Sequence, residues 1–215
     1  MSHYYLLLDS TWFHDRFRPA MVASWRQKSF QPCQALCGEL TEAARAFSAT
    51  YHVFTEGSLT AVAAGVPFDR HLWRCLVGEA LLYGASEIPE IQSTIESLTR
   101  LLAPDRTPRL DGPRECLAPI HQAHFGSRDL EFDTAIYRPE QVGVNRVSDV
   151  RRLAEYLGSL EPAAWTIADL DSADELLDDE ARAGELEYIR EWFPPLRQLY
   201  ERARTREQIV VCETP

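Results

Sequence analysis

Residues 121 to 145, "HQAHFGSRDLEFDTAIYRPEQVGVN", hold many of the side chains in this sequence that could do chemistry. His121 and His124 form an H-x-x-H pair, whose spacing on a helix would turn both rings to one face, as a metal site requires. Pro119 precedes the pair and Gly126 follows it, so we do not expect a stable helix there. Asp129 or Glu131 could be a third ligand, but histidines that bond to backbone groups are commoner, so we predict no metal and no cofactor.

The same segment could also bind a ligand or a partner. His124 could act as an acid or a base near neutral pH, and Arg128 could hold a carboxylate or a phosphate. Alternatively, Arg128 pairs with Asp129 or Glu131 and only holds the loop closed. The predicted ligand- or partner-binding residues are His121, His124, Arg128, Asp129, Tyr137, Arg138, Asn145 and Glu79.

Glu79 is included because it lies in an otherwise apolar helical pattern, "CLVGEALLYG". A buried carboxylate needs a partner, and His124 and Arg128 could provide one, so the three side chains would form a single polar cluster inside the fold. The alternative places Glu79 on an exposed stripe of its helix.

The charge of the chain is negative and unevenly distributed. The formal net charge is −11 at pH 7. Between residues 161 and 191 there are eleven acidic and two basic side chains, a formal charge of −9. Such a segment repels nucleic acid and anionic membranes, and it attracts a basic protein surface. It could also be only a solvated helix face that aids solubility.

The cysteines and the apolar runs predict a cytoplasmic protein. The five cysteines are odd in number and scattered, which is typical of reduced thiols, and Cys33 and Cys37 form a C-x-x-x-C pair with no second pair after it. The apolar run from residue 4 to residue 8 is too short for a signal peptide. No apolar stretch approaches the roughly 18 residues of a membrane span.

The periodicity of apolar residues predicts a single α+β domain, mostly helical, with a small sheet. Strands are expected at 4–8, 130–137 and 208–212, and helices at 36–50, 69–83, 89–102 and 185–204. "TWFHDRFRPAM" is expected to be irregular, because Pro19 would end a helix. Pro194 and Pro195 predict a kink or two abutting helices. The proline-rich stretch 103–119 is either a long connector within one domain or a boundary between two.

Four segments towards the C-terminus have a distinctive pattern: "YRPEQV", "VRRLAEYL", "YIREWFPPLRQLYERA" and "IVV". With them the chain resembles, mainly over its C-terminal third, the YfbM-like family of uncharacterised bacterial proteins. "YYLLL" is compatible with the first strand of that family. The Pro194–Pro195 pair and "HQAHFGSRDLEFD" depart from the family pattern. The resemblance implies a small cytoplasmic α+β domain and brings no activity, cofactor or catalytic residue.

Two functions fit these observations. The first is a non-catalytic cytoplasmic protein that binds a protein partner, such as an acidic inhibitor or immunity factor directed against a toxin. The second is a small enzyme or ligand-binding protein that uses segment 121–145. The acidic segment favours the first, and the polar run favours the second.

Overall fold

The computed structural model describes residues 2–38, 41–50, 65–93, 95–102, 113–129, 141–170 and 178–214. At its centre is an antiparallel sheet with the strand order β2-β1-β6-β5-β4, in which β3 also pairs with β1. The strands are β1 (Ser2–Asp9), β2 (Ala85–Glu87), β3 (Glu90–Gln92), β4 (Arg128–Asp129), β5 (Gln141–Asn145) and β6 (Gln208–Thr214). The first and last strands of the chain both lie in this sheet, as the sequence predicts, and the structure places them side by side in its middle.

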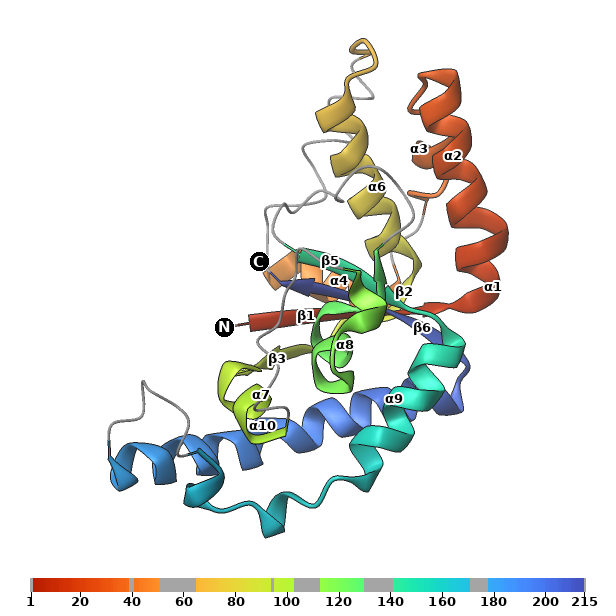
Figure 1. Cartoon of the computed structure of the whole chain (residues 1–215). Coiled ribbons are helices and arrows are strands. Elements are labelled where there is room, and N and C mark those ends of the chain that lie inside the picture. The colour runs from red at the N-terminus through yellow and green to blue at the C-terminus, as the bar shows by residue number, and fades with distance from the viewer. Residues whose placement is uncertain are drawn as a thin grey trace.

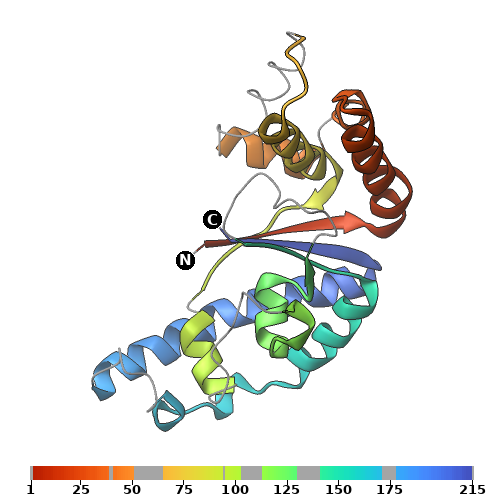
Figure 2. The same ribbon diagram turned by 45° about the horizontal axis from the view of Figure 1, so that its top comes forward.

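Helices cover both faces of this sheet, so the molecule has three layers (Figures 1 and 2). On one face lie α1 (Ser10–Trp12), η1 (Phe13–Phe17), α2 (Arg18–Gln27), α3 (Gln31–Gln34), α4 (Glu42–Thr50) and α6 (Arg70–Gly84). On the other lie α7 (Ile95–Leu102), α8 (Pro119–Phe125), α9 (Val147–Ser159) and α10 (Asp179–Thr205). Short 3₁₀ turns are η2 (Arg114–Cys116), η3 (Pro162–Ala164) and η4 (Ile167–Leu170). This confirms the predicted α+β class with mostly helical content.

The sheet has a hydrophobic core on each face because β1 is apolar on both sides. Successive side chains of a strand point to opposite faces. Tyr5 and Leu7 accordingly pack in the core between the sheet and helices α7 to α10. Leu6 and Leu8 pack in the core on the opposite face, between the sheet and helices α2 and α6. All four side chains are fully buried. This two-sided burial explains why the sequence here reads as a continuous apolar run.

The helix that follows β1 corrects one prediction. Residues 10–27 are helical throughout, although "TWFHDRFRPAM" was expected to be irregular. The helix widens to a π-helical turn at Phe13–Phe17, where the backbone N–H of Arg18 donates to the carbonyl of Phe13. A proline has no N–H, and its ring disfavours a regular α-helical turn before it, so a wider turn at this point lets Pro19 enter α2 in its first turn.

The other predicted elements agree in part. Helices 69–83 and 185–204 are confirmed as α6 and α10, whereas helix 36–50 is reduced to α4. Helix 89–102 begins only at Ile95, because residues 90–92 form β3 and the carbonyl of Pro89 accepts the N–H of Tyr5 at 3.0 Å. The strand expected at 130–137 and residues 103–112 of the proline-rich stretch lie outside the described residues.

Candidate functional site

The H-x-x-H pair lies on a helix, which the sequence argument did not expect. Pro119 occupies the first turn of α8, where its missing N–H has no intrahelical partner to lose. Gly126 ends the helix with a φ of 84°, a left-handed value that favours glycine. Proline and glycine thus define the two ends of a short helix. His121 and His124 are both buried within it.

The end of α8 lies directly against β5, and two glycines make this approach possible. A Cβ atom on Gly126 would be 2.5 Å from the carbonyl carbon of Gly143, and a Cβ atom on Gly143 would overlap the carbonyl oxygen of Phe125. The contact brings Asn145 of β5 against the polar side chains of α8. The geometry of this part of the molecule therefore depends on backbone contact rather than on a flexible loop.

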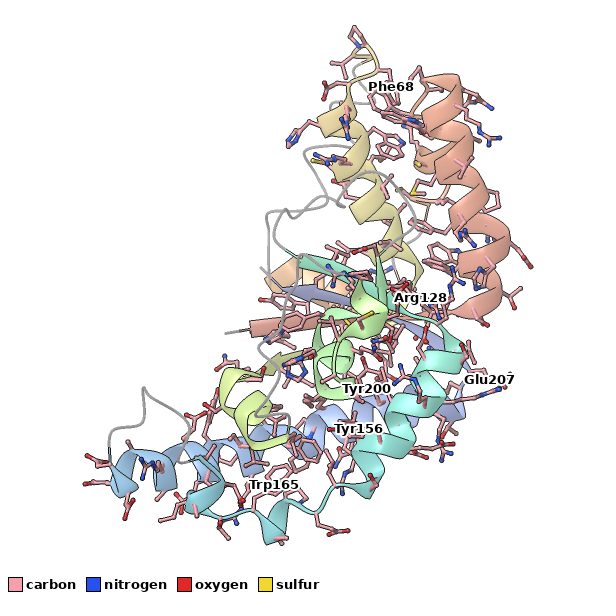
Figure 3. All side chains as sticks on the ribbon, viewed as in Figure 1. Phe68, Arg128, Tyr156, Trp165, Tyr200 and Glu207 are labelled. Carbon is pink, nitrogen blue, oxygen red and sulfur yellow. The ribbon has the colours of Figure 1, made fainter. Side chains whose placement is uncertain are left out.

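Asn145 is the centre of a buried network of hydrogen bonds. Its Oδ1 accepts from the Ser127 backbone N–H at 2.8 Å and from the Ser127 hydroxyl at 2.5 Å. Its Nδ2 donates to the Gln122 carbonyl at 2.9 Å and to the Tyr200 hydroxyl at 2.8 Å. The Tyr200 hydroxyl in turn donates to the carbonyl of Ala123 at 2.6 Å. Figure 3 shows Tyr200 in the layer beneath the sheet. We call these residues and Cys212 the Asn145 network.

The two titratable side chains of this network, Tyr200 and Cys212, stay protonated. Burial, with the nearby Cys212, raises the pKa of the Tyr200 phenol well above its usual value, and burial raises the pKa of the Cys212 thiol to about 12. Both side chains are therefore neutral at pH 7. The Asn145 amide already makes four hydrogen bonds to nitrogen and oxygen partners, which is its full capacity, and its Nδ2 also lies 3.6 Å from Cys212 Sγ. We assign Asn145 a structural role.

Arg128 and Asp129 are also engaged within the protein, but not with each other. The Arg128 Nε donates to Asp149 Oδ2 at 3.1 Å, and the same carboxylate oxygen accepts the backbone N–H of Arg146 at the start of α9. Asp129 accepts from Arg114 Nε at 2.5 Å, and Arg114 also donates to the carbonyl of Phe125. Of the two partners that the alternative gave Arg128, Asp129 is wrong, and Glu131 lies outside the described residues. Arg128 nevertheless keeps two fifths of its side chain exposed, at 40%.

His124 lies in a second polar group, on the same face of the sheet. Its ring centroid is 5.0 Å from that of His3, 6.4 Å from that of Tyr5 and 5.5 Å from that of Trp192. Its Nε2 lies 3.2 Å from the hydroxyl oxygen of Ser93. These side chains come from β1, α10 and the residue after β3. With His121, whose charge would influence His124, they form what we call the His124 cluster.

The His124 cluster is uncharged at neutral pH. Burial lowers the pKa of His3 and that of His121 to about 4 each. Burial, with the neighbouring His3 and His121, lowers the pKa of His124 well below its usual value. Among the residues that the structure describes, no group of three or more His, Cys, Asp or Glu side chains has an arrangement that could hold a metal ion.

Glu79 does not belong to either group. It is fully buried, as the first of the two predicted alternatives requires. It lies, however, on α6, on the opposite face of the sheet from His124, so the predicted cluster of Glu79, His124 and Arg128 is wrong. Glu79 instead lies near Cys37. Burial, and to a smaller extent the charge of this carboxylate, raises the pKa of the Cys37 thiol to about 12. Burial likewise raises the pKa of Cys33 to about 11, so neither cysteine is a reactive thiolate.

Two predicted residues, Tyr137 and Arg138, lie outside the described residues. The structure adds several residues that the sequence argument did not select: His3, Tyr5, Ser93, Arg114, Gln122, Trp192, Tyr200 and Cys212. His3 and Tyr5 could have been found, because they alternate on one side of the first strand. The others are brought together only by the tertiary fold.

In comparisons with protein-family models, curated proteins and solved structures, nothing matches this chain. The resemblance to the YfbM-like family therefore stays a prediction. No helix within the described part of the chain combines the length and the apolar character that a membrane span needs.

Proposed function

We propose that this protein is a non-catalytic binding protein that recognises a protein partner with a basic surface. The observation that carries the proposal is the acidic end of α10. In Figures 1 and 2 the N-terminal part of this helix runs past the edge of the sheet, with η4 beside it. A charged element that projects from the body of a protein can reach a partner without disturbing the core.

The charge of this end is strong and solvent-exposed. The described residues of 161–170 and 178–191 hold eight acidic side chains and two arginines. Seven of the eight acidic side chains are exposed: Glu161, Asp169, Asp178, Asp179, Glu180, Glu187 and Glu191. Arg190 is held against the chain by donating to the carbonyls of Pro162 and Trp165. We define these seven exposed acidic residues as the acidic end.

Complementary charge raises the rate at which partners meet and disfavours partners of the same sign. The acidic end would therefore favour a basic protein and disfavour nucleic acid. An inhibitor or immunity factor that covers the basic surface of a toxin is one protein of this class.

The engagement of the polar side chains of segment 121–145 supports this proposal over the alternative, an enzyme or ligand-binding protein that uses this segment. Asn145 is saturated by internal hydrogen bonds, and Arg128 is paired with Asp149. His124 is buried and neutral, so it could serve as a base only for a molecule that enters the core. We place the protein in the cytoplasm, and the free state of all five cysteines supports this location.

The test is a quantitative affinity purification from source cells with three forms of the protein. In the first variant, Glu180→Gln, Glu187→Gln and Glu191→Gln remove three charges from the acidic end without changing side-chain volume. The matched control removes three exposed charges elsewhere, with Glu42→Gln, Glu115→Gln and Glu155→Gln. We expect a specific partner that the wild type and the control recover equally. The first variant should bind that purified partner about tenfold more weakly, because each exposed charge pair contributes only modestly to the binding free energy.

The affinity of the wild type should also fall as salt is raised, since exposed charges are screened. A partner that binds the acidic-end variant as tightly as the wild type would contradict the proposal. So would recovery of a specific small molecule with no protein.

A further inference from the structure

Among the residues that the structure describes, three buried polar atoms around His124 have no hydrogen-bond partner. They are the Tyr5 hydroxyl, the His124 Nδ1 and the Trp192 indole N–H. Tyr5 and His124 are fully buried, and Trp192 is 4% exposed. Native proteins pair the large majority of such groups, so three on adjacent rings call for a specific explanation. In the neighbouring Asn145 network, by contrast, both amide atoms of Asn145 have their hydrogen-bond partners.

We propose that the His124 cluster is a binding site for a small oxyanion, such as a short-chain carboxylate. The site lies on the inner face of α8, where β1 supplies Tyr5 and α10 supplies Trp192. This inference is independent of the proposed function, because the acidic end and the His124 cluster share no residue.

The chemistry of the unpartnered atoms selects a ligand that accepts hydrogen bonds. The Trp192 indole can only donate, and the Tyr5 phenol, which burial keeps protonated, has a hydrogen to donate. The His124 Nδ1 becomes a donor when the Ser93 hydroxyl donates to Nε2, or when the ring is protonated. Carboxylate oxygens are acceptors only, so they match a group of two or three donors on rings that pack against His124.

The histidines allow an anion to be neutralised inside the core. A buried anion without a counter-charge is unfavourable. His3 on β1 and His121 on α8 are the titratable side chains that influence His124, and Tyr5 and Tyr200 are neutral phenols nearby. Binding of one anion with uptake of one proton by an imidazole would leave the core without net charge. A cationic ligand has no such compensation, because the described side chains of the cluster include no carboxylate.

The test uses formate and acetate as probes, with sodium chloride at the same ionic strength and methylammonium chloride as comparisons. We expect formate or acetate to raise the melting temperature of the wild-type protein by roughly 5 °C at concentrations about 100-fold above Kd. Titration calorimetry in buffers of different ionisation enthalpy should show uptake of about one proton. The affinity should weaken by up to about tenfold for each unit that the pH is raised.

Two variants remove a donor and keep an aromatic ring: Tyr5→Phe, which loses only the hydroxyl, and Trp192→Phe, which replaces the indole by a smaller phenyl ring. The matched controls are Tyr4→Phe, on the other face of the sheet, and Trp165→Phe, whose ring packs against Phe193 in the same core. We expect the two donor variants to lose the stabilisation by formate and the two controls to keep it. Either donor variant alone is sufficient if the other does not fold.

Three results would overturn the proposal. The first is equal stabilisation by chloride and by the carboxylates. The second is stabilisation that persists in the folded donor variants. The third is no stabilisation at all, with a high-resolution structure that shows only water on these atoms.

Discussion

At the scale of single residues, the buried polar side chains at and around α8 are in two different situations. Those of the Asn145 network are bonded to one another and to backbone carbonyls, whereas three atoms around His124 have no hydrogen-bond partner among the described residues. The two situations predict opposite effects of substitution. Removing one member of a satisfied buried network leaves its partners unpaired, while removing an unpaired hydroxyl removes an unfavourable burial.

We therefore expect Asn145→Ala to lower the free energy of unfolding by about 2–4 kcal/mol, because it leaves the Ser127 N–H and the Tyr200 hydroxyl without their partner. Tyr5→Phe should leave the stability of the ligand-free protein unchanged or slightly higher. Urea denaturation followed by circular dichroism measures both. An Asn145→Ala protein as stable as the wild type would show that this network is not structural.

The contact between α8 and β5 gives a second prediction at this scale. Gly143→Ala should lower the free energy of unfolding by about 2 kcal/mol or more, because the new Cβ overlaps the carbonyl oxygen of Phe125 and approaches Arg114 Nη1 to 2.9 Å. Gly158→Ala is the control: it lies inside α9 with no neighbour within 4 Å of the added Cβ. Alanine there should raise stability by about 0.5–1 kcal/mol. A neutral Gly143→Ala would refute the close approach of the two backbones.

At the scale of elements, apolar periodicity predicted those with a strong pattern. The continuous apolar runs in β1 and β6 correspond to strands that are buried on both faces, and the three-to-four spacing in α6 and α10 corresponds to a helix face that is buried in the fold. Proline misled the prediction at three places. Pro19 enters a helix through a widened turn, Pro89 precedes a strand, and Pro119 begins α8. A proline has a fixed φ and no backbone N–H donor, but tertiary packing decides whether the chain before it bends.

The pair Pro194–Pro195 shows the same competition within α10. The sequence predicted a kink or two helices, and the structure has one helix, Asp179–Thr205. Contacts on both sides of the pair fix its course. Arg190 donates to the carbonyls of Pro162 and Trp165 on one side, and Arg197 donates to the carbonyl of Leu157 at 2.9 Å on the other. Packing therefore holds a helix that local preference would interrupt.

Because packing opposes the prolines, replacing the exposed one should stabilise the protein. We expect Pro195→Ala to raise the free energy of unfolding by about 1–3 kcal/mol, since alanine restores a backbone donor in a helix interior. The measurement is the urea midpoint, with Ala183→Gly, at an exposed position in the same helix, expected to lower it by about 1 kcal/mol. A Pro195→Ala protein less stable than the wild type would mean that α10 needs a local distortion at this point.

At the scale of the whole molecule, the sequence predicted the polar residues but not their grouping. His121, His124 and Asn145 were selected for their type, and all three are in buried polar groups. Glu79 was grouped with His124, although the sheet separates them. The neighbours of His124 and Asn145 include Tyr200, Trp192 and His3, which come from the two ends of the chain. No local sequence pattern places these residues beside α8. Composition predicts which residues can do chemistry, whereas topology decides which of them meet.

The three buried histidines make the stability of the whole fold depend on pH. Burial lowers the pKa of His3 and that of His121 from 6.5 to about 4, and it lowers the pKa of His124 well below 6.5. Between pH 6.5 and about 4 the unfolded chain therefore binds protons that the folded chain does not. The contribution of these neutral histidines to the free energy of unfolding is fully present above pH 6.5. Below that pH the free energy of unfolding should fall by up to about 1.4 kcal/mol per pH unit for each histidine.

Urea denaturation between pH 8 and pH 5 measures this dependence. The double variant with His3→Gln and His121→Gln should show a shallower decline than the wild type. A control with His14→Gln and His71→Gln, both exposed, should decline as the wild type does. Equal slopes for the two double variants would mean that the buried histidines are not held neutral.

The negative charge is concentrated at one end of the molecule, because the acidic end lies where α10 projects past the sheet. Recognition through this end is tested most directly by site-specific photocrosslinking in source cells, with a benzophenone amino acid in place of Glu187 or, as the matched position, Glu155 on α9. The account predicts a discrete crosslinked protein from position 187 that is absent from position 155. A partner captured at position 155 and not at position 187 would contradict it.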